Sequence, residues 1–377
     1  MPKFPLSDHC DGERFFNPVA NARPLTDVIK WSRTRERTAW PAHVPLAPHP
    51  APPAAVEHGT AAVTFVGHST FLIRTATMVI MTDPVLTARA GPFGRLGPRR
   101  VRPPAIAPSA LPPVDLVLVS HNHYDHLQPS SLRRFADRAV YVAPLGVASQ
   151  TRIRPRVSVP PEVRYSSVDK TGGDEVGKSG SGQIEKGRGA PLQNFAVSAF
   201  RRNLHELDWW QSVTAGDAEI TCVPAQHFSA RTLWDRNRTL WCGYVVQTGG
   251  VTIYFAGDSG YAPHFTAIGA RFPAIDLALL PIGAYEPRWF MKPVHMNPDE
   301  AVRAHLDLRA RRSLGMHFGT FQLTDEAIDE PLRALERARL AHGVGAEAFG
   351  VLDFGETAAI DSASSLHSAP SQLRNGQ

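Results

Sequence analysis

The sequence predicts an α+β fold in which β-sheets pack on each other and helices cover their outer surfaces. Short β-branched and apolar runs, which are typical of strands, recur from residue 61 to residue 319. Helical spacing of apolar residues is confined to a few segments dispersed among these runs. An apolar content of 43% beside 20% charged residues is ordinary for a globular chain and allows a sizeable core.

The first segment, residues 1–60, is rich in proline and ends in PAHVPLAPHPAPPAAVEHG. This composition is typical of an arm or strap with little regular structure. The two aromatic residues of RFFNP, at 14–18, are expected to dock the arm on the domain.

Strands are expected from residue 61 onward, beginning with a meander of three: AAVTFVG, TFLIRT and TMVIMTDP. The later strands are predicted at 115–120, 139–144, 218–228, 240–248, 251–260, 276–285 and 313–319. Helices are predicted at 129–136, 298–308 and 325–341. Pro331 is expected to kink or interrupt the last of these helices.

The folded domain is expected to span residues 61–355, followed by a C-terminal tail at 356–377. Residues 160–203 look like an insertion, because the stretch SSVDKTGGDEVGKSGSGQIEKGRGA is glycine-rich, polar and nearly free of large apolar residues. A flexible surface loop is the simpler interpretation of this segment, and a lid over a functional site is the alternative.

The cellular compartment is predicted from the cysteines and the N-terminus. Cys10, Cys222 and Cys242 are too few and too far apart for a disulfide framework or a zinc knuckle, which favours a reducing compartment. The N-terminus lacks an apolar signal region, and no window approaches membrane-spanning length. The expected location is therefore cytoplasmic, with any membrane contact made at the surface.

The chain is mildly basic, with a net charge of +5 and a pI near 9.3. This permits attraction to anionic lipid, nucleic acid or phosphate substrates without choosing among them, and a solvated surface explains it as well. Part of the charge lies in the loop GPFGRLGPRRVRPP, which carries Arg95, Arg99, Arg100 and Arg102. These arginines face either anionic lipid or solvent.

Directly after the strand predicted at 115–120, the segment SHNHYDHLQP places His121, His123 and His126 within six residues, with Asp125 among them. Alternate residues at a strand end point the same way, so His121 and His123 can bind one ion. Asp125 and His126, on the following turn, can reach a second ion. Imidazole and carboxylate suit zinc and related ions better than magnesium or calcium. The alternative is a histidine-rich surface loop, or histidines that are hydrogen-bonded within the fold.

Three more candidate ligands follow predicted strands: His227 in AQHFS, Asp258 in FAGDSGY and His317 in GMHFGTF. Each alone is more often structural. Together with SHNHYDHLQP they give five histidines and two aspartates beside strand ends, which predicts a site for two metal ions.

The order HxHxDH, His, Asp, His resembles that of the metallo-β-lactamase superfamily, whose fold is a four-layer αβ/βα sandwich. Further motifs narrow the resemblance to the N-acylphosphatidylethanolamine-hydrolysing phospholipases D, over about residues 14 to 355. These motifs are VTFVGHSTFLI, MTDPVL, GPRRVRPP, LDWW, RTLWDRNRTLWCGY, IGARF and GAYEPRWFMK. The last is the most specific, because the wider superfamily does not share it.

This resemblance implies two zinc ions per chain and a ligand role for each matched residue. One ion would be bound by His121, His123 and His227, the other by Asp125, His126 and His317, with Asp258 as the bridge between them. A hydroxide held between the ions would attack a phosphodiester and release phosphatidic acid and an N-acylethanolamine. Asp125 and Asp258 would hold the site together and orient this hydroxide, which makes them the catalytic candidates.

The resemblance also implies that Tyr124 and His295 donate hydrogen bonds to a phosphoryl oxygen. Alternatively, Tyr124 is simply packed and His295 only caps the helix that opens at Asn297. The run Tyr285–Met291 either shapes an acyl groove or lipid interface, or belongs to the core or a subunit contact. Val294 and Phe318 replace the family's glutamine and tryptophan, so head-group and acyl preference cannot be carried over.

The predicted function is a dinuclear zinc phosphodiesterase that acts on N-acylphosphatidylethanolamine or a related phospholipid. The same fold hosts many chemistries, so hydrolysis of a lactone or of a nucleic-acid phosphodiester is an alternative. A catalytically silent lipid-binding protein is another. No nucleic-acid partner is expected, since the arginine loop is the only segment of a kind that could bind RNA or DNA. The expected partners are a phospholipid and a membrane surface, and both monomer and homodimer stay open.

Overall fold

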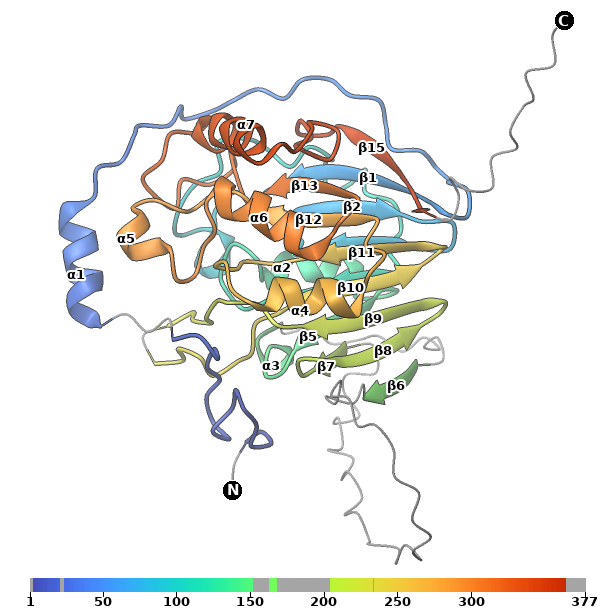
Figure 1. Cartoon of the computed structure of the whole chain (residues 1–377), viewed down its shortest axis with the longest axis horizontal. Coiled ribbons are helices and arrows are strands. Elements are labelled where there is room, and N and C mark those ends of the chain that lie inside the picture. Colours follow the sequence, from blue (N-terminus) through green and yellow to red (C-terminus); the bar gives the residue numbers. More distant parts are fainter. Residues whose placement is uncertain (1–2, 21–23, 152–162, 168–203, 233, 364–377) are drawn as a thin grey trace, which may run out of the picture.

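Two β-sheets lie face to face in this protein, with helices on the outer face of each (Figure 1). The computed structural model describes residues 3–20, 24–151, 163–167, 204–232 and 234–363. Most of the predicted insertion at 160–203 therefore lies outside the described residues. Among the residues described, no helix has both the length and the apolar character needed to cross a membrane.

The first sheet has the strand order β15-β1-β2-β3-β4-β5-β7. Its strands are β1 (Thr60–Gly67), β2 (Thr70–Arg74), β3 (Val79–Thr82), β4 (Leu116–Leu118), β5 (Val140–Pro144), β7 (Leu204–Leu207) and β15 (Thr357–Asp361). β1, β2 and β3 form the expected antiparallel meander, and β3, β4, β5 and β7 run parallel. β15 pairs with β1, with Thr60 opposite Asp361. The folded domain thus continues past residue 355 into the segment predicted to be a tail.

The second sheet has the strand order β14-β13-β12-β11-β10-β9-β8-β6. Its strands are β6 (Val163–Ser167), β8 (Gln211–Ala215), β9 (Ala218–Val223), β10 (Gly243–Thr248), β11 (Val251–Phe255), β12 (Leu277–Pro281), β13 (Arg312–Met316) and β14 (Phe349–Gly350). β8 to β11 are antiparallel, whereas β11 to β14 are parallel. β6, from the predicted insertion, pairs with β8 at one edge.

The helices are α1 (Leu25–Thr34), α2 (Pro129–Leu132), α3 (Ala148–Thr151), α4 (His264–Arg271), α5 (Arg288–Met291), α6 (Pro298–Leu308) and α7 (Glu330–His342), with 3-10 turns at Pro92–Gly94 and Arg133–Phe135. α4, α6 and α7 cover the second sheet, and α2 and α3 lie on the first (Figure 1). α7 begins beside Pro331 instead of being kinked by it, because the first turn of a helix needs no N–H from proline. α1 lies in the arm, which was predicted to have little regular structure.

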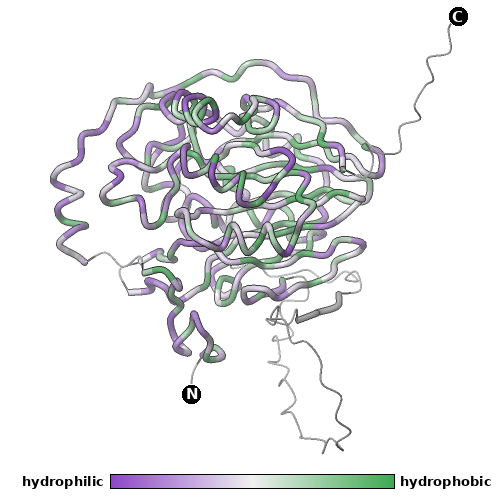
Figure 2. Tube along the Cα trace, in the orientation of Figure 1, coloured by the Kyte–Doolittle hydropathy of each residue, from purple (hydrophilic) through white to green (hydrophobic). Residues whose placement is uncertain are grey.

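Alternation along the strands divides the apolar residues between two cores. On β4, Leu116 and Leu118 face the core between the sheets, whereas Val117 faces the core under α2 with Leu132 and Phe135. Because the strands of both sheets are buried, the interior of the molecule is hydrophobic along their length (Figure 2). This arrangement confirms the predicted four-layer sandwich of sheets and helices.

Candidate metal centre

The loop after β4 carries His121 and His123, and the loop after β9 carries His227. Nε2 of His121 lies 2.8 Å from Nδ1 of His123, and Nε2 of His227 lies 3.2 Å from that same Nδ1. Three ring nitrogens therefore meet at one point, although the histidines come from the two opposite sheets. We call this group the first cluster.

The outer ring nitrogens of the first cluster are held by the protein. Nδ1 of His227 donates to the backbone carbonyl of Val294 over 2.9 Å, and Nδ1 of His121 lies 2.9 Å from Oγ of Ser120. The bond to a carbonyl fixes the N–H on Nδ1 of His227, which leaves a lone pair on Nε2. The ring is thus oriented as a metal ligand would be.

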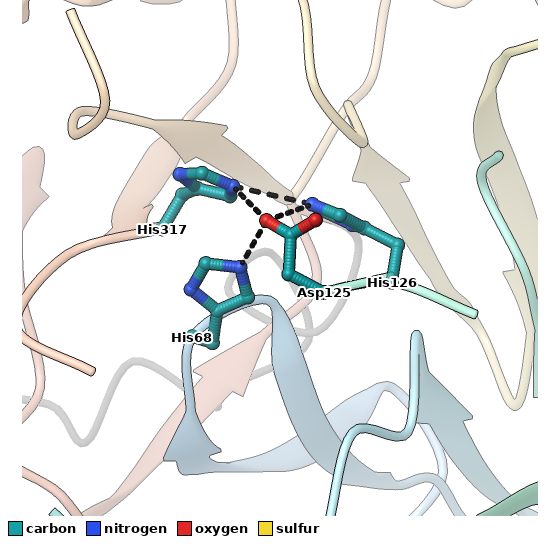
Figure 3. Close-up of side chains that lie close together, drawn as sticks. All are labelled: His68, Asp125, His126 and His317. Carbon is teal, nitrogen blue, oxygen red and sulfur yellow. Dashed lines mark hydrogen bonds and ion pairs between the residues drawn. The ribbon is translucent and has the colours of Figure 1, made fainter. Parts of the chain in front are cut away.

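A second cluster lies beside the first and consists of His68, Asp125, His126 and His317 (Figure 3). Oδ2 of Asp125 is 3.0 Å from Nε2 of His68, 3.4 Å from Nε2 of His317 and 3.6 Å from Nε2 of His126. The Nε2 atoms of His126 and His317 approach each other to 3.2 Å. Four side chains thus direct their ligand atoms toward one small volume.

Asp258, after β11, lies between the two clusters. Its Oδ2 is 3.1 Å from Nε2 of both His126 and His317, and 3.8 Å from Nε2 of His227. Its Oδ1 is buried and has no hydrogen-bond partner within the described part of the chain. All seven ligands predicted from the sequence are therefore brought together, with Asp258 where a bridging ligand would lie.

Sequence reasoning assigned no role to His68 or Asp83. His68, in the turn after β1, contacts Asp125 as described above. Asp83, after β3, accepts from the backbone N–H and the hydroxyl of Ser120 at 2.7 and 2.5 Å, and its Oδ2 lies 2.7 Å from Nδ1 of His126. It therefore orients His126 and, through Ser120, His121. Both residues follow predicted strands, which is the signal that found the other ligands.

His68 and His317 also share an unusual backbone. Their φ angles are 61° and 65°, in the left-handed region that non-glycine residues rarely adopt. Such conformations cost on the order of 1–3 kcal/mol and persist only when their surroundings impose them. Here the N–H of His317 donates to the carbonyl of His68 over 2.9 Å. This bond joins the two sheets at the second cluster.

Burial lowers the pKa values of the clustered histidines, whereas the neighbouring carboxylates raise them. Burial lowers the pKa of His121 and His227 well below the ordinary range, so both rings are neutral and can offer lone pairs. Burial opposes charge on His126 and His317 too, but Asp258 and Asp125 outweigh it. They hold the pKa of His126 well above its ordinary value and raise the pKa of His317 to about 9.

These observations fit metal binding. Ring nitrogens approach within 3.2 Å of one another, and a buried carboxylate oxygen has no partner among the described residues. A cation satisfies lone pairs that otherwise face each other in a buried space. Histidine nitrogen and carboxylate oxygen are ligands of zinc and similar transition metals. The two clusters can therefore hold metal ions, and we refer to them together as the metal centre.

A cavity of about 340 Å³ opens beside the metal centre. His123, Asp125, Asp258 and His295 form its polar side. Its remaining wall is mainly apolar and includes Val28, Trp31, Phe228, Phe290, Met291, Val294 and Leu323. Charged and apolar parts of one ligand can therefore be bound side by side.

His295 and Tyr124, the two predicted substrate contacts, differ in position. His295 lines the cavity, and its buried Nδ1 lies 4.0 Å from Oδ2 of Asp258. It is not the cap of α6, because the side chain of Asn297 accepts from Glu300 N over 2.9 Å and forms a capping box. Tyr124 is half-buried under the guanidinium of Arg231, 3.9 Å from its ring centroid. It is not part of the cavity wall, and its substrate contact stays a prediction.

The N-terminal arm supplies one side of this cavity. The ring of Trp31 in α1 stacks on Phe290 of α5, with centroids 4.9 Å apart and planes 8° from parallel. Arg35 donates to Asp325 over 2.7 Å at the end of the helix. The aromatic run is thereby divided: Phe290 and Met291 line the cavity, Tyr285 is buried elsewhere and Trp289 is 39% exposed.

The arginine loop supports the metal centre more than it forms a surface. Arg100 is buried and donates to the carbonyl of Val85 over 2.9 Å. Arg102 donates to the carbonyl of Gly319, two residues after the ligand His317. Of these four arginines only Arg95 and Arg99 are exposed. The other two, which were predicted to face lipid or solvent, form hydrogen bonds within the fold instead.

Comparisons with known proteins agree with this fold. The model of the β-lactamase superfamily domain matches residues 79–181 and 182–318. An uncharacterized protein of Mycobacterium tuberculosis is 37% identical over 299 residues, which cover 77% of this chain and 68% of that one. The N-acyl-phosphatidylethanolamine-hydrolyzing phospholipase D 1 of Caenorhabditis elegans is 35% identical over 298 residues, with 78% and 74% covered.

Among solved structures, an isothiocyanate hydrolase from Delia radicum gut bacteria shares the fold. The TM-score is 0.53 at 17% identity, with 80% of this chain and 100% of that chain covered. Together these findings identify the chain as a metal-dependent hydrolase. It belongs to the metallo-β-lactamase superfamily, in the group that includes the N-acylphosphatidylethanolamine-hydrolysing phospholipases D.

Proposed function

We propose that this protein is a dinuclear zinc phosphodiesterase that hydrolyses N-acylphosphatidylethanolamine, or a related phospholipid, to phosphatidic acid and an N-acylethanolamine. The observation that carries the proposal is the opening of the metal centre onto an apolar cavity. A phosphate needs the cations, and an acyl chain needs the apolar wall. The activity named for the C. elegans relative supports the same substrate class.

Two clusters with one carboxylate between them support a pair of ions, and their nitrogen and oxygen ligands suit zinc. Two such cations lower the pKa of water toward neutrality and offset the negative charge that develops at phosphorus. Asp125 and Asp258 supply the negative charge that holds the ions. No other described carboxylate lines the cavity, so we assign no separate general base.

His295 is the residue best placed to bind the phosphoryl group. Burial lowers its pKa to about 4, so the imidazole is neutral near pH 7 and carries one N–H. Its Nδ1 has no hydrogen-bond partner among the described residues. A phosphoryl oxygen in the cavity can accept from this ring. Tyr124 is the second candidate for binding the phosphoryl group, but its ring would have to move away from the guanidinium of Arg231 to reach the substrate.

The mouth of the cavity supports peripheral contact with a lipid surface. Val28 and Ile29 of α1 are 38% and 42% exposed, and Trp289 of α5 is 39% exposed. α1 and α5 lie together on the same side of the molecule (Figure 1). The ammonium of Lys30 lies 4.8 Å above the ring of Trp289. Aromatic and basic side chains together are typical of the interface between lipid and water.

The alternative substrates are less well matched by the cavity. Single-stranded nucleic acid is bound by basic grooves with stacking platforms, whereas this wall is largely aliphatic and aromatic with one arginine, Arg236. A lactone needs no anion site, and a silent lipid-binding protein would need no cluster of metal ligands. A homodimer stays a prediction.

The test offers zinc-loaded protein three substrates: micelles of N-acylphosphatidylethanolamine, a lactone panel and single-stranded RNA. We expect the wild type to release phosphatidic acid and to hold about two zinc ions per chain by metal analysis. We expect His121→Ala to lose this activity and to bind less zinc. His342→Ala, on the exposed end of α7, is the control and should match the wild type. Turnover of only a lactone or RNA would contradict the proposal.

A further inference from the structure

The loop that follows the ligand His227 carries three arginines, and the structure uses them differently. Arg231 is fixed in place: it donates to the carbonyls of Asn122 and Leu127 over 2.7 and 2.9 Å and covers the ring of Tyr124. It therefore holds the metal-binding loop in shape. Arg238 is exposed and is not part of the cavity wall.

Arg236 is the one arginine of this loop that lines the cavity. Its guanidinium lies 4.3 Å from the centroid of Phe228, and it shares the cavity with His123, Asp125 and Asp258. Within the described ranges it forms no ion pair and its side chain donates no hydrogen bond. An arginine is thus presented on the wall of the metal-centre cavity with its donors uncommitted.

The only acidic side chain next to Arg236 in sequence is already engaged. Oδ1 of Asp235 accepts from the backbone N–H groups of Arg231 and Thr232, at 2.9 and 2.7 Å. The N–H of Asn237 donates to the carbonyl of Ser229 over 2.8 Å and closes the loop. The backbone on both sides of Arg236 is therefore fixed, and the contact of its guanidinium with the ring of Phe228 keeps the side chain beside the cavity.

The N-terminal arm fixes the same loop from outside. The carbonyl of Arg236 accepts from the guanidinium of Arg14, and the carbonyl of Asn237 accepts from Phe15 N over 2.8 Å. Arg236 and His123 of the first cluster line the same cavity, so the field of the guanidinium charge extends into the space beside that cluster. A ligand anion at the metal centre lies within that same field.

We propose that Arg236 binds a phosphate oxygen of the ligand at the metal centre and thereby selects phosphate esters over neutral esters and lactones. A planar guanidinium donates two parallel hydrogen bonds to such a group. The inference rests on the proposed function only in taking phosphate as the anion. It adds a residue that selects ligands by their charge. Among the described residues that line the cavity, Arg236 is the only lysine or arginine.

The first test measures binding without turnover. Zinc-loaded wild type, Arg236→Gln and Arg238→Gln are titrated calorimetrically with inorganic phosphate and, separately, with glycerophosphoethanolamine. A hydrogen bond to a charged group is worth about 1.5–3 kcal/mol, so Arg236→Gln should bind about tenfold or more weakly. Arg238→Gln should stay within about twofold of the wild type, and Arg236→Lys should recover part of the loss. Weakening toward glycerophosphoethanolamine alone assigns Arg236 to a lipid head group, and weakening toward both assigns it to phosphate generally.

The second test measures turnover. Arg236→Gln should raise KM for N-acylphosphatidylethanolamine about tenfold and leave any turnover of a neutral lactone unchanged. If Arg236→Gln, Arg238→Gln and the wild type bind both inorganic phosphate and glycerophosphoethanolamine with equal affinity, the inference is overturned, even if the lipid is hydrolysed. Tight phosphate binding through Arg236 without phosphodiester turnover would instead overturn the proposed function and leave this inference standing. Arg236→Lys keeps the test valid if Arg236→Gln does not fold.

Discussion

The metal centre and the N-terminal arm both bury histidines against aspartates, but they satisfy them differently. In the arm, the ring of His9 is bonded on both sides, with Nδ1 2.7 Å from Asp8 and Nε2 2.7 Å from Asp208. In the metal centre, Asp258 faces four histidines while its Oδ1 has no hydrogen-bond partner in the described chain. A buried pair whose polar atoms all have hydrogen-bond partners stabilises the fold. A buried carboxylate oxygen without a partner marks a place where a ligand can bind.

The largest effect is expected from removing the charge between the clusters. Asp258→Asn keeps the shape of the side chain but removes the negative charge that the two cations of the proposed site would share. Metal-ion catalysis contributes several kcal/mol, so activity should fall about a thousandfold or more, with less zinc bound. Metal analysis and initial rates measure both. Asp329→Asn, on the exposed start of α7, is the control. Full zinc content in Asp258→Asn would mean that this carboxylate is not a ligand.

A smaller loss is expected from Asp83→Asn, because Asp83 orients a ligand without facing the ions. The amide cannot replace the carboxylate that lies 2.7 Å from Nδ1 of His126. Outer partners of this kind are worth about 10- to 100-fold in metal affinity. Competition with a chelator measures the change. The control is Asp115→Asn, which removes a carboxylate that pairs with Arg138 just before β4, at the opposite end of that strand from the ligand loop. If both variants lose zinc equally, the effect is one of stability.

These two aspartates show how far the sequence could predict the site. Asp258 was found because its motif follows a strand and completes a known order of ligands. Asp83 and His68 also follow strands, but their roles depend on which loops become neighbours in space, and periodicity carries no such information. The same limit applies to β15, which is defined only by its pairing with β1. The runs of β-branched and apolar residues predicted most of the strands and the packing of sheets with helices outside, whereas the four-layer arrangement was implied by the resemblance and the strand order came from the structure.

The arm was the least predictable region, because its proline-rich composition hides α1 and only tertiary contacts give it a role. Trp31→Ala removes the ring that stacks on Phe290 and opens the cavity wall. We expect unchanged zinc content but about tenfold weaker binding of long-chain substrate, from the loss of roughly 1–2 kcal/mol of aromatic contact. KM for long- and short-chain lipids measures this, and Trp31→Phe should retain most of the affinity. Equal KM values in all three proteins would place the acyl chain elsewhere.

The smallest effect, and the one that most directly contrasts the arm with the metal centre, is expected from His9→Gln. Burial opposes charge on His9, but Asp208 and Asp8 outweigh it and raise its pKa above 6.5. A raised folded-state pKa gives stability that is fully present below about pH 6.5 and is lost as pH rises through the raised value.

The free energy of unfolding should therefore fall between pH 6 and pH 8.5 by about 1 kcal/mol more in the wild type than in His9→Gln. The metal ligands respond to pH in both proteins alike, so the difference between the two isolates the arm. Chemical denaturation at each pH measures it. Parallel pH profiles would show that His9 stays neutral when folded. Its pairing with Asp208 would then be an uncharged hydrogen bond, and the arm would owe its docking to Phe15, Trp209 and the other apolar contacts of that surface.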